Sequence, residues 1–480
     1  MMLSPSDYLE QNAVSLSRGL REKAYTVEDL TISAISRAEA INPIINAIVT
    51  ENYEKALTQA KYIDKNPKLL EASALAGFPF LIKDLSTVKG LPATFGSRLF
   101  KEHVAKKSSR IVESYLKAGL NIFGLTNTPE FGLTLTTEPV ANGITKNPWN
   151  TAYSTGGSSG GAAAAVAAGI LPVAHATDGG GSIRIPASCC GLFGLKPSRG
   201  LTCIENDLTG SWTGMSVGHV VSQTVQDSAA FLDLITLKNA HLFPIPKNTG
   251  PFLSQIEAGS ARLKIGLQLK HPFDLPIDPD CLEALDLSAK QCETLGHTVE
   301  EISTPLEYEP VVSAMSKLIN TFIYRRVNSR LSELDLNLED AQVESSTRIM
   351  AKLGSRVTAE DFIAAKDHIF NAELKLREFH KYYDLILSPV LAKTPAKLGW
   401  LDMNSDDMKN YTNSFRTYSG FTSIYNGTGQ PSMSVPMKHS SKGLPIGVMF
   451  TGKWGSDLTL LQLARELEQV HPWQRFTTPS

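Results

Sequence analysis

The segment over residues 154–200 restricts the fold and chemistry of this chain more than any other part. It is rich in glycine, serine and alanine, and it places Ser158 within Gly-Gly-Ser-Ser-Gly-Gly and Ser182 directly after three glycines. The small residues 161–168 predict a helix that lies very close to neighbouring backbone, and residues 170–176 predict a buried strand. Because glycine permits unusual backbone conformations, N–H groups at either turn can converge on a negatively charged atom.

A phosphate-binding loop is the first interpretation of such a segment, since glycines that lead into a helix can hold phosphate. The P-loop pattern, however, requires Gly-Lys-Ser/Thr, and no lysine follows these glycines. The dinucleotide spacing G-x-G-x-x-G is also absent. The segment therefore disfavours nucleotide binding.

An α/β-hydrolase is the second interpretation, because residues 157–161 match G-x-S-x-G with Ser159 at the elbow. That fold needs a later acid and then a histidine, and the latest histidines are His439 and His471. His439 lies in the polar stretch Lys-His-Ser-Ser-Lys, which is typical of a solvated surface loop, and no HGGG-type motif lies upstream. A serine esterase that uses Ser159 remains an alternative function.

The third interpretation uses both serine turns together with an upstream lysine. Taken as a whole, the segment resembles the amidase signature family, and the interval between Ser158 and Ser182 is the interval of that family. The resemblance extends from the N-terminal helices to the closing helix, and it is weakest between about 300 and 430. The matching segments are residues 156–161, 178–187 and 191–197, with the lysine-bearing segment at 77–84 and a further segment at 124–132.

The resemblance implies a catalytic triad of Lys83, Ser158 and Ser182. In that scheme Ser182 attacks the amide carbonyl, Ser158 passes the proton to Lys83, and water hydrolyses the acyl-enzyme. The family's bridging serine follows a cis peptide bond, which is expected before Ser158. The implied oxyanion hole consists of backbone N–H groups from Gly179, Gly180, Gly181 and Ser182.

Elementary physical chemistry sets a condition on this scheme. A serine hydroxyl needs a base, and a lysine serves as one only where burial penalises its charged form and lowers its pKa. The apolar run Phe-Pro-Phe-Leu-Ile before Lys83 supplies such a setting. The competing interpretation is that Lys83 only pairs with Asp84 at a strand end. Lys196 is a rival base, but Gly-Leu-Lys-Pro is typical of a structural turn.

Supporting roles are expected for three further residues near the serines. Asp178 and Arg184 flank the nucleophile and are expected to form an ion pair that orients its loop, and Ser159 is expected to add a hydrogen bond. The adjacent Cys189 and Cys190 have no neighbouring histidine to generate a thiolate, so they are interpreted as packing residues.

The implied fold is α/β, a single large domain with a central mixed, mostly parallel sheet covered by helices on both faces. The amidase domain is expected to span 1–480, with the signature core at about 70–240 and a variable substrate-pocket region at about 300–430. The pattern elsewhere fits alternating helices and strands. The predicted helices cover residues 26–41, 110–118, 227–237, 280–295, 359–379 and 457–470, and the predicted strands cover residues 77–84, 120–125, 263–267, 383–388 and 446–451.

Composition excludes several other classes of protein. The 480 residues include 46 Lys and Arg against 48 Asp and Glu, which leaves no electrostatic footprint for nucleic acid or an anionic membrane. The start Met-Met-Leu-Ser-Pro-Ser-Asp lacks the features of a signal peptide, and no apolar run reaches the ~20 residues of a membrane span. We therefore expect a cytoplasmic protein. Its sparse cysteines lack C-x-x-C spacing, so we expect reduced thiols rather than disulfides or zinc; they lie at 189, 190, 203, 281 and 292.

The expected partner is a small-molecule amide, with no cofactor, metal, nucleic acid or membrane, and the chain is compatible with a homodimer. Gly179 stands where the family more often has threonine, and Ala162 where it often has serine. The Gly179 change resembles one branch, the 6-aminohexanoate-cyclic-dimer hydrolases and related bacterial amidases. The glutaminase subunit of the tRNA-dependent amidotransferase is the alternative within the family. The natural substrate stays open; four aromatic residues either line an apolar acyl site or belong to the core, namely Phe322, Tyr324, Phe415 and Tyr418.

Overall fold

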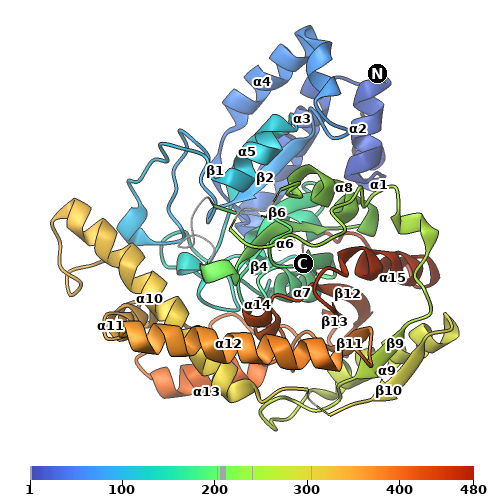
Figure 1. Ribbon diagram of the computed structural model, residues 1–480. Coiled ribbons are helices and arrows are strands. Elements are labelled where there is room, and N and C mark those ends of the chain that lie inside the picture. The colour runs from blue at the N-terminus through green and yellow to red at the C-terminus, as the bar shows by residue number, and fades with distance from the viewer. Residues whose placement is uncertain (1–2, 203, 206–211, 240–241, 304, 480) are drawn as a thin grey trace.

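A computed structural model describes residues 3–202, 204–205, 212–239, 242–303 and 305–479. The N-terminal part forms one end of the molecule, in blue in Figure 1. The helix after Thr26 begins with a capping box, in which the Thr26 side chain accepts from the Asp29 N–H and the Asp29 side chain accepts from the Thr26 N–H. The helices of this N-terminal part are α1 (Pro5–Glu10), α2 (Ala13–Arg21), α3 (Val27–Ile45), α4 (Tyr53–Lys65) and α5 (Arg110–Lys117).

Three strands in this part form a small sheet in the order β1-β3-β2, with β3 antiparallel to β1 and parallel to β2. The five residues of β2 are all buried, as the apolar run before Lys83 predicts. The last strand residue, Lys83, donates its backbone N–H to Nδ1 of His175 on β6, so β2 lies directly beside the edge of the large sheet. The three strands are β1 (Ile48–Glu51), β2 (Pro79–Lys83) and β3 (Asn121–Thr126).

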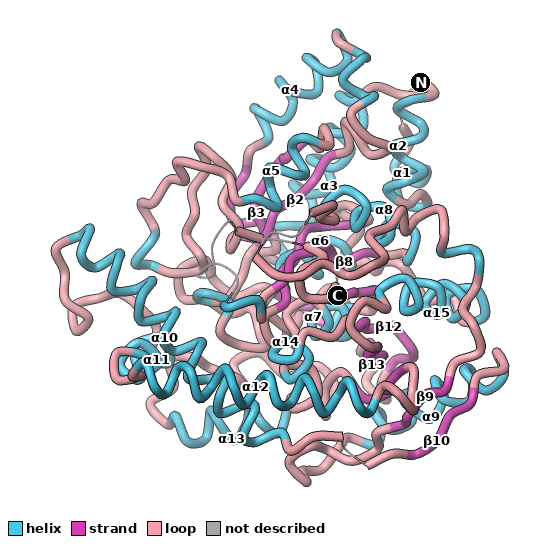
Figure 2. Tube along the Cα trace, in the orientation of Figure 1, coloured by secondary structure: helices cyan, strands magenta, loops and turns pink. Residues whose placement is uncertain are grey.

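The large sheet has eight strands in the order β10-β9-β11-β13-β12-β7-β8-β6, with helices on both sides (Figures 1 and 2). A short hairpin, β4 (Lys146–Asn147) with β5 (Asn150–Ser154), precedes it in the chain. The strands of the large sheet are β6 (Val173–Asp178), β7 (Phe193–Lys196), β8 (Val217–Ser222), β9 (Lys264–Leu267), β10 (Thr298–Glu301), β11 (Leu385–Pro389), β12 (Ser432–His439) and β13 (Pro445–Gly452).

The single-domain α/β fold with a mixed sheet is confirmed, but the expectation that most strands run parallel is wrong. Five of the seven neighbouring strand pairs are antiparallel, and only β9–β10 and β9–β11 are parallel. Strands buried on both faces are continuously apolar in either direction, so the pattern does not report direction. One signal was available: the link from His439 to Pro445 is too short for a parallel crossover.

The glycine-rich segment forms the centre of the molecule. All eight residues of α6 (Gly160–Ala167) are buried, and every residue of β6 and of α7 (Arg184–Cys190) is buried as well. A Cβ on Gly161 would lie only 2.4 Å from the backbone nitrogen of Asn127, so only glycine permits this approach. The expected close-packed helix and buried strand are confirmed.

The remaining helices include a layer in orange and yellow along one side of Figure 1. There α10 packs against α11 and α12. Buried residues of α10 and α12, among them Leu318 and Ile369, form a hydrophobic core cluster with Ile386 and Met449 of the large sheet. No helix in the described part of the chain is both long and apolar enough to cross a membrane. These helices are α8 (Val225–Ile235), α9 (Pro279–Thr294), α10 (Tyr308–Leu334), α11 (Ser345–Gly354), α12 (Ala359–Phe379), α13 (Met408–Tyr418), α14 (Ile424–Thr428) and α15 (Asp457–Val470).

Candidate active site

The Lys83 side-chain nitrogen lies among three hydroxyl groups and is fully buried. Its Nζ is 2.7 Å from Oγ of Ser158, 2.8 Å from Oγ of Ser159 and 3.1 Å from Oγ1 of Thr177. Burial lowers the pKa of Lys83 far below its ordinary value, and the charge of Asp178 opposes this effect only in part. The site therefore favours the uncharged amine.

An uncharged amine has two N–H donors and one lone pair, and this count constrains the three hydroxyl groups. Ser159 donates its own hydroxyl to the backbone carbonyl of Thr177 at 3.2 Å, so it accepts from Nζ. The second N–H and the lone pair then face Ser158 and Thr177. We assign the lone pair to Ser158, because that contact is the shorter of the two.

The peptide bond between Gly157 and Ser158 is cis, as expected. The backbone of Thr136 packs against this bond so closely that a Cβ on Gly157 would lie in contact with its carbonyl oxygen. Ser158 then precedes α6, and a Cβ on Gly132 would lie 3.0 Å from its Oγ. The turn therefore fixes the Ser158 hydroxyl between Lys83 and the loop at Gly132.

Ser182 follows β6 in a loop that the carboxylate of Asp178 organises. One carboxylate oxygen accepts from the N–H of Gly181 at 2.7 Å, and the other accepts from the N–H of Ile183 at 3.1 Å. These bonds hold the residues on both sides of Ser182. Among the hydrogen bonds of the described residues, none joins Ser182 to Ser158; such contacts often form only when substrate is bound.

The expected ion pair between Asp178 and Arg184 is present, with 2.9 Å between Nη2 and Oδ1 and both side chains fully buried. Burial alone would raise the pKa of Asp178, but the Arg184 guanidinium more than offsets it and holds the pKa well below its usual range. Arg184 also donates to the carbonyl of Thr422 at 2.9 Å and to Oδ1 of Asn426 at 2.7 Å. The pair therefore links the nucleophile loop to the segment before α14.

Asn426, Thr422 and Thr177 are site residues to which the sequence analysis assigned no role. Asn426 donates to the backbone and side chain of Asp178, both at 2.9 Å, and Thr422 donates to the carbonyl of Gly180 at 2.7 Å. Asn426 lies 248 positions after Asp178 in the chain, and no sequence pattern links the two. Thr177 directly precedes Asp178, and this position next to an expected site residue was a signal in the sequence that Thr177 belongs to the site.

The expected set of oxyanion donors needs one correction. The N–H of Gly181 is committed to Asp178, which places it outside the set. Within the described part of the chain, no hydrogen bond uses the N–H of Gly179, Gly180 or Ser182. A Cβ on Gly180 would meet no atom closer than 3.8 Å, so the chain borders open space there. Three backbone donors therefore remain candidates.

The rival groups are engaged elsewhere. Lys83 does not pair with Asp84, whose carboxylate accepts from the N–H of Thr94 at 3.1 Å. Lys196 is fully buried, and burial lowers its pKa to about 7, but its Nζ donates to the carbonyl of Pro197 at 2.9 Å.

The nucleophiles of the alternative functions also lack the partners they need. Ser159 bonds to Lys83, whereas His471 bonds to the carbonyl of Met437 at 2.7 Å. Burial raises the pKa of the Cys189 thiol to about 12, which keeps it protonated. Among the described residues, no group of three or more His, Cys, Asp and Glu is arranged to hold a metal ion.

A cavity of about 440 Å³ borders this centre. It reaches Thr177, which contacts Lys83, and Trp212, whose ring lies 2.9 Å from the position of a Cβ on Gly179. Of the four aromatic residues considered from the sequence, Phe322 lines the cavity. The others do not: Tyr324 is exposed, Phe415 is half-buried beside Tyr411, and Tyr418 is a buried core residue.

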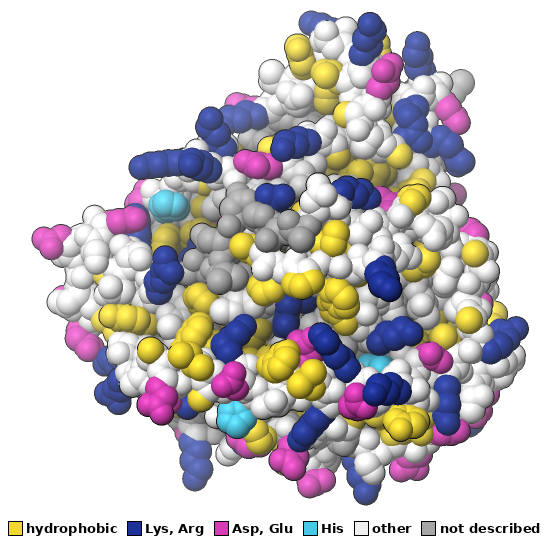
Figure 3. All heavy atoms as spheres, viewed as in Figure 1, with side chains coloured by type: hydrophobic (Ala, Val, Ile, Leu, Met, Phe, Trp, Pro, Cys, Tyr) yellow, Lys and Arg dark blue, Asp and Glu magenta, His cyan; other side chains and the backbone are white. Residues whose placement is uncertain are grey.

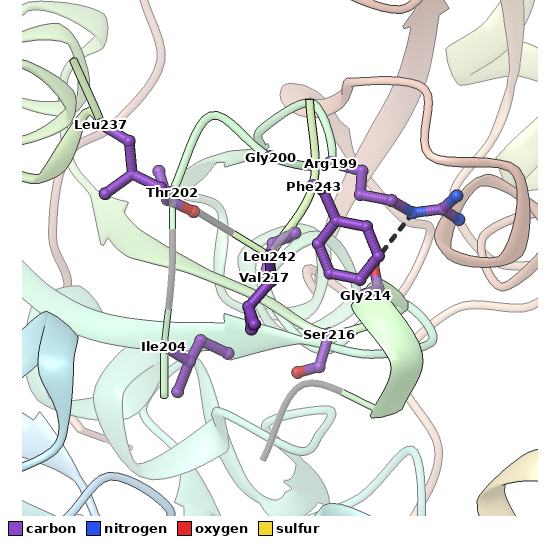
Figure 4. A pocket seen from close by; sticks show the side chains of 10 residues that line it. All are labelled: Arg199, Gly200, Thr202, Ile204, Gly214, Ser216, Val217, Leu237, Leu242 and Phe243. Atoms are coloured by element: carbon purple, nitrogen blue, oxygen red, sulfur yellow. Dashed lines mark hydrogen bonds between the residues drawn. The ribbon is translucent and has the colours of Figure 1, made fainter. Parts of the chain in front are cut away.

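A second cavity, of only about 20 Å³, lies next to the first, and Figure 4 shows the side chains that line it. Nε of Arg199 donates to the carbonyl of Gly214 at 3.2 Å across its rim. Ile204 and Ser216 line both cavities. Because the second cavity has room for about one water molecule, it is too small for a substrate, whereas the first is large enough.

Comparison with known proteins identifies related chains. The Amidase family model matches residues 29–461. A 6-aminohexanoate-cyclic-dimer hydrolase from Paenarthrobacter ureafaciens is 33% identical over 479 residues, which are 97% of this chain and 96% of the relative. A solved 6-aminohexanoate cyclic dimer hydrolase complexed with substrate has a TM-score of 0.89 at 31% identity, covering 97% of this chain and 98% of that one. A bacterial aryl acylamidase of the amidase signature family has a TM-score of 0.85 at 25% identity, covering 96% of each chain.

Proposed function

Because this chain belongs to the amidase family and is therefore an amide hydrolase, we propose that it cleaves a non-peptide linear or cyclic amide with Ser182, Ser158 and Lys83. One observation supports this proposal above all: a fully buried Nζ lies 2.7 Å from the Ser158 hydroxyl, and two further hydroxyl groups occupy its N–H donors. Such an amine can accept a proton from only one direction.

In the proposed first half-reaction, the Ser182 hydroxyl proton moves to Ser158 while the Ser158 proton moves to Lys83. The Ser182 oxygen bonds to the carbonyl carbon, and the carbonyl oxygen becomes negatively charged. The free N–H groups of Gly179, Gly180 and Ser182 itself stabilise that charge, and each such donor contributes about 2.7–4 kcal/mol. Asp178 and Arg184 hold the loop but exchange no proton.

The tetrahedral intermediate then collapses and breaks the carbon–nitrogen bond. The leaving nitrogen takes its proton from Ser158, which recovers one from the Lys83 ammonium, so the relay returns to its starting state. Water then attacks the acyl-enzyme and loses a proton through Ser158 to Lys83. The second tetrahedral intermediate breaks the bond to Ser182, whose oxygen takes a proton from Ser158 while Ser158 recovers one from Lys83, so the carboxylic acid leaves and the site returns to its starting state. No cofactor enters this balance.

Labelling with a fluorophosphonate, followed by peptide mapping, tests the proposal. We expect the adduct on Ser182, no adduct in Ser182→Ala, and labelling slowed by orders of magnitude in Lys83→Met with an unchanged near-UV circular dichroism spectrum. Lys196→Met is the matched control, since it removes another fully buried lysine. An adduct on Ser159, or loss of labelling in Lys196→Met but not in Lys83→Met, would contradict the assignment.

Turnover assays separate the free amidase from the alternative functions. We expect the isolated chain to hydrolyse simple anilides without ATP or tRNA. Hydrolysis that requires both, together with a co-purifying partner, would instead indicate the glutaminase subunit of an amidotransferase.

A further inference from the structure

The cavity of about 440 Å³ has two chemically different ends. Its inner end lies at the proposed triad, because Thr177 lines it and contacts Lys83 at 3.1 Å. Leu85 also lines it, and a Cβ on Gly132 would touch both the Leu85 side chain, at 2.8 Å, and the Ser158 hydroxyl, at 3.0 Å. The scissile amide therefore belongs at this end.

Much of the cavity wall is apolar. Seven large apolar side chains line it besides Leu85, and none of them offers a charge to a ligand. A chain of methylene groups or an apolar ring gains free energy when it leaves water for such a wall. The seven are Phe95, Phe100, Phe131, Ile204, Trp212, Phe322 and Ile323.

The outer end is formed by one face of α10 and is rich in guanidinium groups: Arg325, Arg326 and Arg330 all line it. Two of these groups lie over aromatic rings of the opposite wall, Arg326 at 4.0 Å from the Phe95 ring centre and Arg330 at 5.4 Å from that of Phe100. In Figure 3, basic side chains lie on the face of the molecule between α5 and α10. A guanidinium group is attracted to the face of an aromatic ring, so the rings help to position both cations.

Two carboxylates, Glu205 and Glu333, line the same end. Glu333 accepts from Arg330 at 2.9 Å, whereas no ion pair of the described residues involves Arg325. Among the described residues that line the cavity, three guanidinium groups face two carboxylates, an excess of one positive charge. His103 lines the same cavity. Burial lowers the pKa of His103, and the positive charge of Arg330 lowers it further.

We propose that the substrate is an amide whose acyl chain ends in a carboxylate, with the amide at Ser182, the apolar chain in the middle of the cavity and the carboxylate at Arg325 and Arg330. A planar guanidinium group matches a carboxylate with two parallel hydrogen bonds, which favours this ligand over a neutral one. The inference rests on the proposed function, since it takes the triad as the inner end of the cavity.

Three p-nitroanilides of equal chain length test it: those of hexanoic acid, of adipic acid with one free carboxylate, and of 6-aminohexanoic acid. We expect kcat/KM to be at least tenfold higher for the carboxylate-ended anilide than for the methyl-ended one, and lowest for the ammonium-ended one. Arg325→Gln should reduce the carboxylate-to-methyl ratio about tenfold, and Glu333→Gln, which releases Arg330, should raise it. Arg356→Gln, an exposed arginine outside the cavity, is the control and should leave the ratio unchanged.

Equal kcat/KM values for the first two anilides, or a ratio that Arg325→Gln does not change, would overturn the inference. A binding measurement separates it from the proposed function. In Ser182→Ala, calorimetry should show the carboxylate-ended anilide binding at least tenfold more tightly than the methyl-ended one. Such a preference without turnover in the unmodified enzyme would contradict the proposed function alone, whereas turnover without the preference would contradict the anion site alone.

Discussion

Replacing Asp178 by asparagine should destabilise the fold and disorganise the nucleophile loop at the same time. The carboxylate and the Arg184 guanidinium are both fully buried, 2.9 Å apart. Asparagine keeps the size of the side chain and one acceptor oxygen, but it removes the charge that compensates the guanidinium. The oxygen that accepts from Gly181 and the one that accepts from Ile183 can no longer both act as acceptors.

The structure sets the size of the effect. Removing one partner of a buried ion pair costs about 3–5 kcal/mol, because the other charge is left without compensation. For a chain of 480 residues the entropy of unfolding is about 1 kcal/mol per kelvin, so Asp178→Asn should lower Tm by about 3–5 °C. Asp286→Asn, which removes the exposed partner of Lys290 in an i,i+4 pair, is the control and should leave Tm nearly unchanged.

Differential scanning calorimetry of a double-mutant cycle provides the assay. Asp178→Asn and Arg184→Met should each be destabilising, and the double variant should be more stable than the sum of the two by about 1–3 kcal/mol. Fluorophosphonate labelling of Ser182 should be slowed in all three variants, since each loses acceptors for the loop. Additive changes in stability together with unchanged labelling would refute the view that the pair orients this loop.

Four further outcomes follow from the same geometry. The labelling rate of the unmodified enzyme should fall as pH decreases, because acid protonates Lys83, and Lys83→Met should lack this dependence. Thr177→Val removes an acceptor for Nζ and should reduce kcat about 3- to 10-fold with KM less affected. Iodoacetamide at pH 8 should leave Cys189 unmodified in the native protein and modify it after unfolding, as peptide mapping would show, because burial raises its pKa to about 12. Burial and the neighbouring Glu130 raise the pKa of Glu344 to about 7. Its protonated form therefore stabilises the fold at low pH, and this contribution is lost as pH rises through 7. Between pH 4.5 and 7, Tm of the unmodified chain should fall relative to that of Glu344→Gln.

Local chemistry made the central segment predictable from the sequence. A helix of small residues, a buried strand and a lysine after an apolar run each follow from residue type and spacing, and the structure contains α6, β6 and β2 where they were expected. Strand direction and the long helix α10 of the outer layer were not predictable in the same way, whereas its neighbour α12 lies at the expected residues 359–379. Five antiparallel pairs and the 27-residue helix α10 depend on contacts between distant parts of the chain, and neither leaves a distinctive period in the sequence.

In the candidate site too, contacts between residues close in sequence were predictable and contacts between distant segments were not. The pairing of Asp178 with Arg184 spans six positions and was expected, whereas Asn426 reaches Asp178 from the far end of the chain. Residues that act on the backbone of a loop, as Thr422 does on Gly180, leave no motif of their own, because many polar side chains can donate one hydrogen bond. Such residues become visible only once the fold has brought the two segments together.

Gly179 stands where the family more often has threonine, and the packing around it gives a physical reason for this difference. A Cβ at Gly179 would lie 2.9 Å from the ring of Trp212, so a threonine there and this placement of the indole exclude each other. Trp212 has a φ of 49°, a conformation rare for a bulky residue, and its ring lines the substrate cavity. The small residue beside Ser182 thus makes room for an aromatic cavity wall directly over the nucleophile loop, and any change of residue at one of these two positions must be matched at the other.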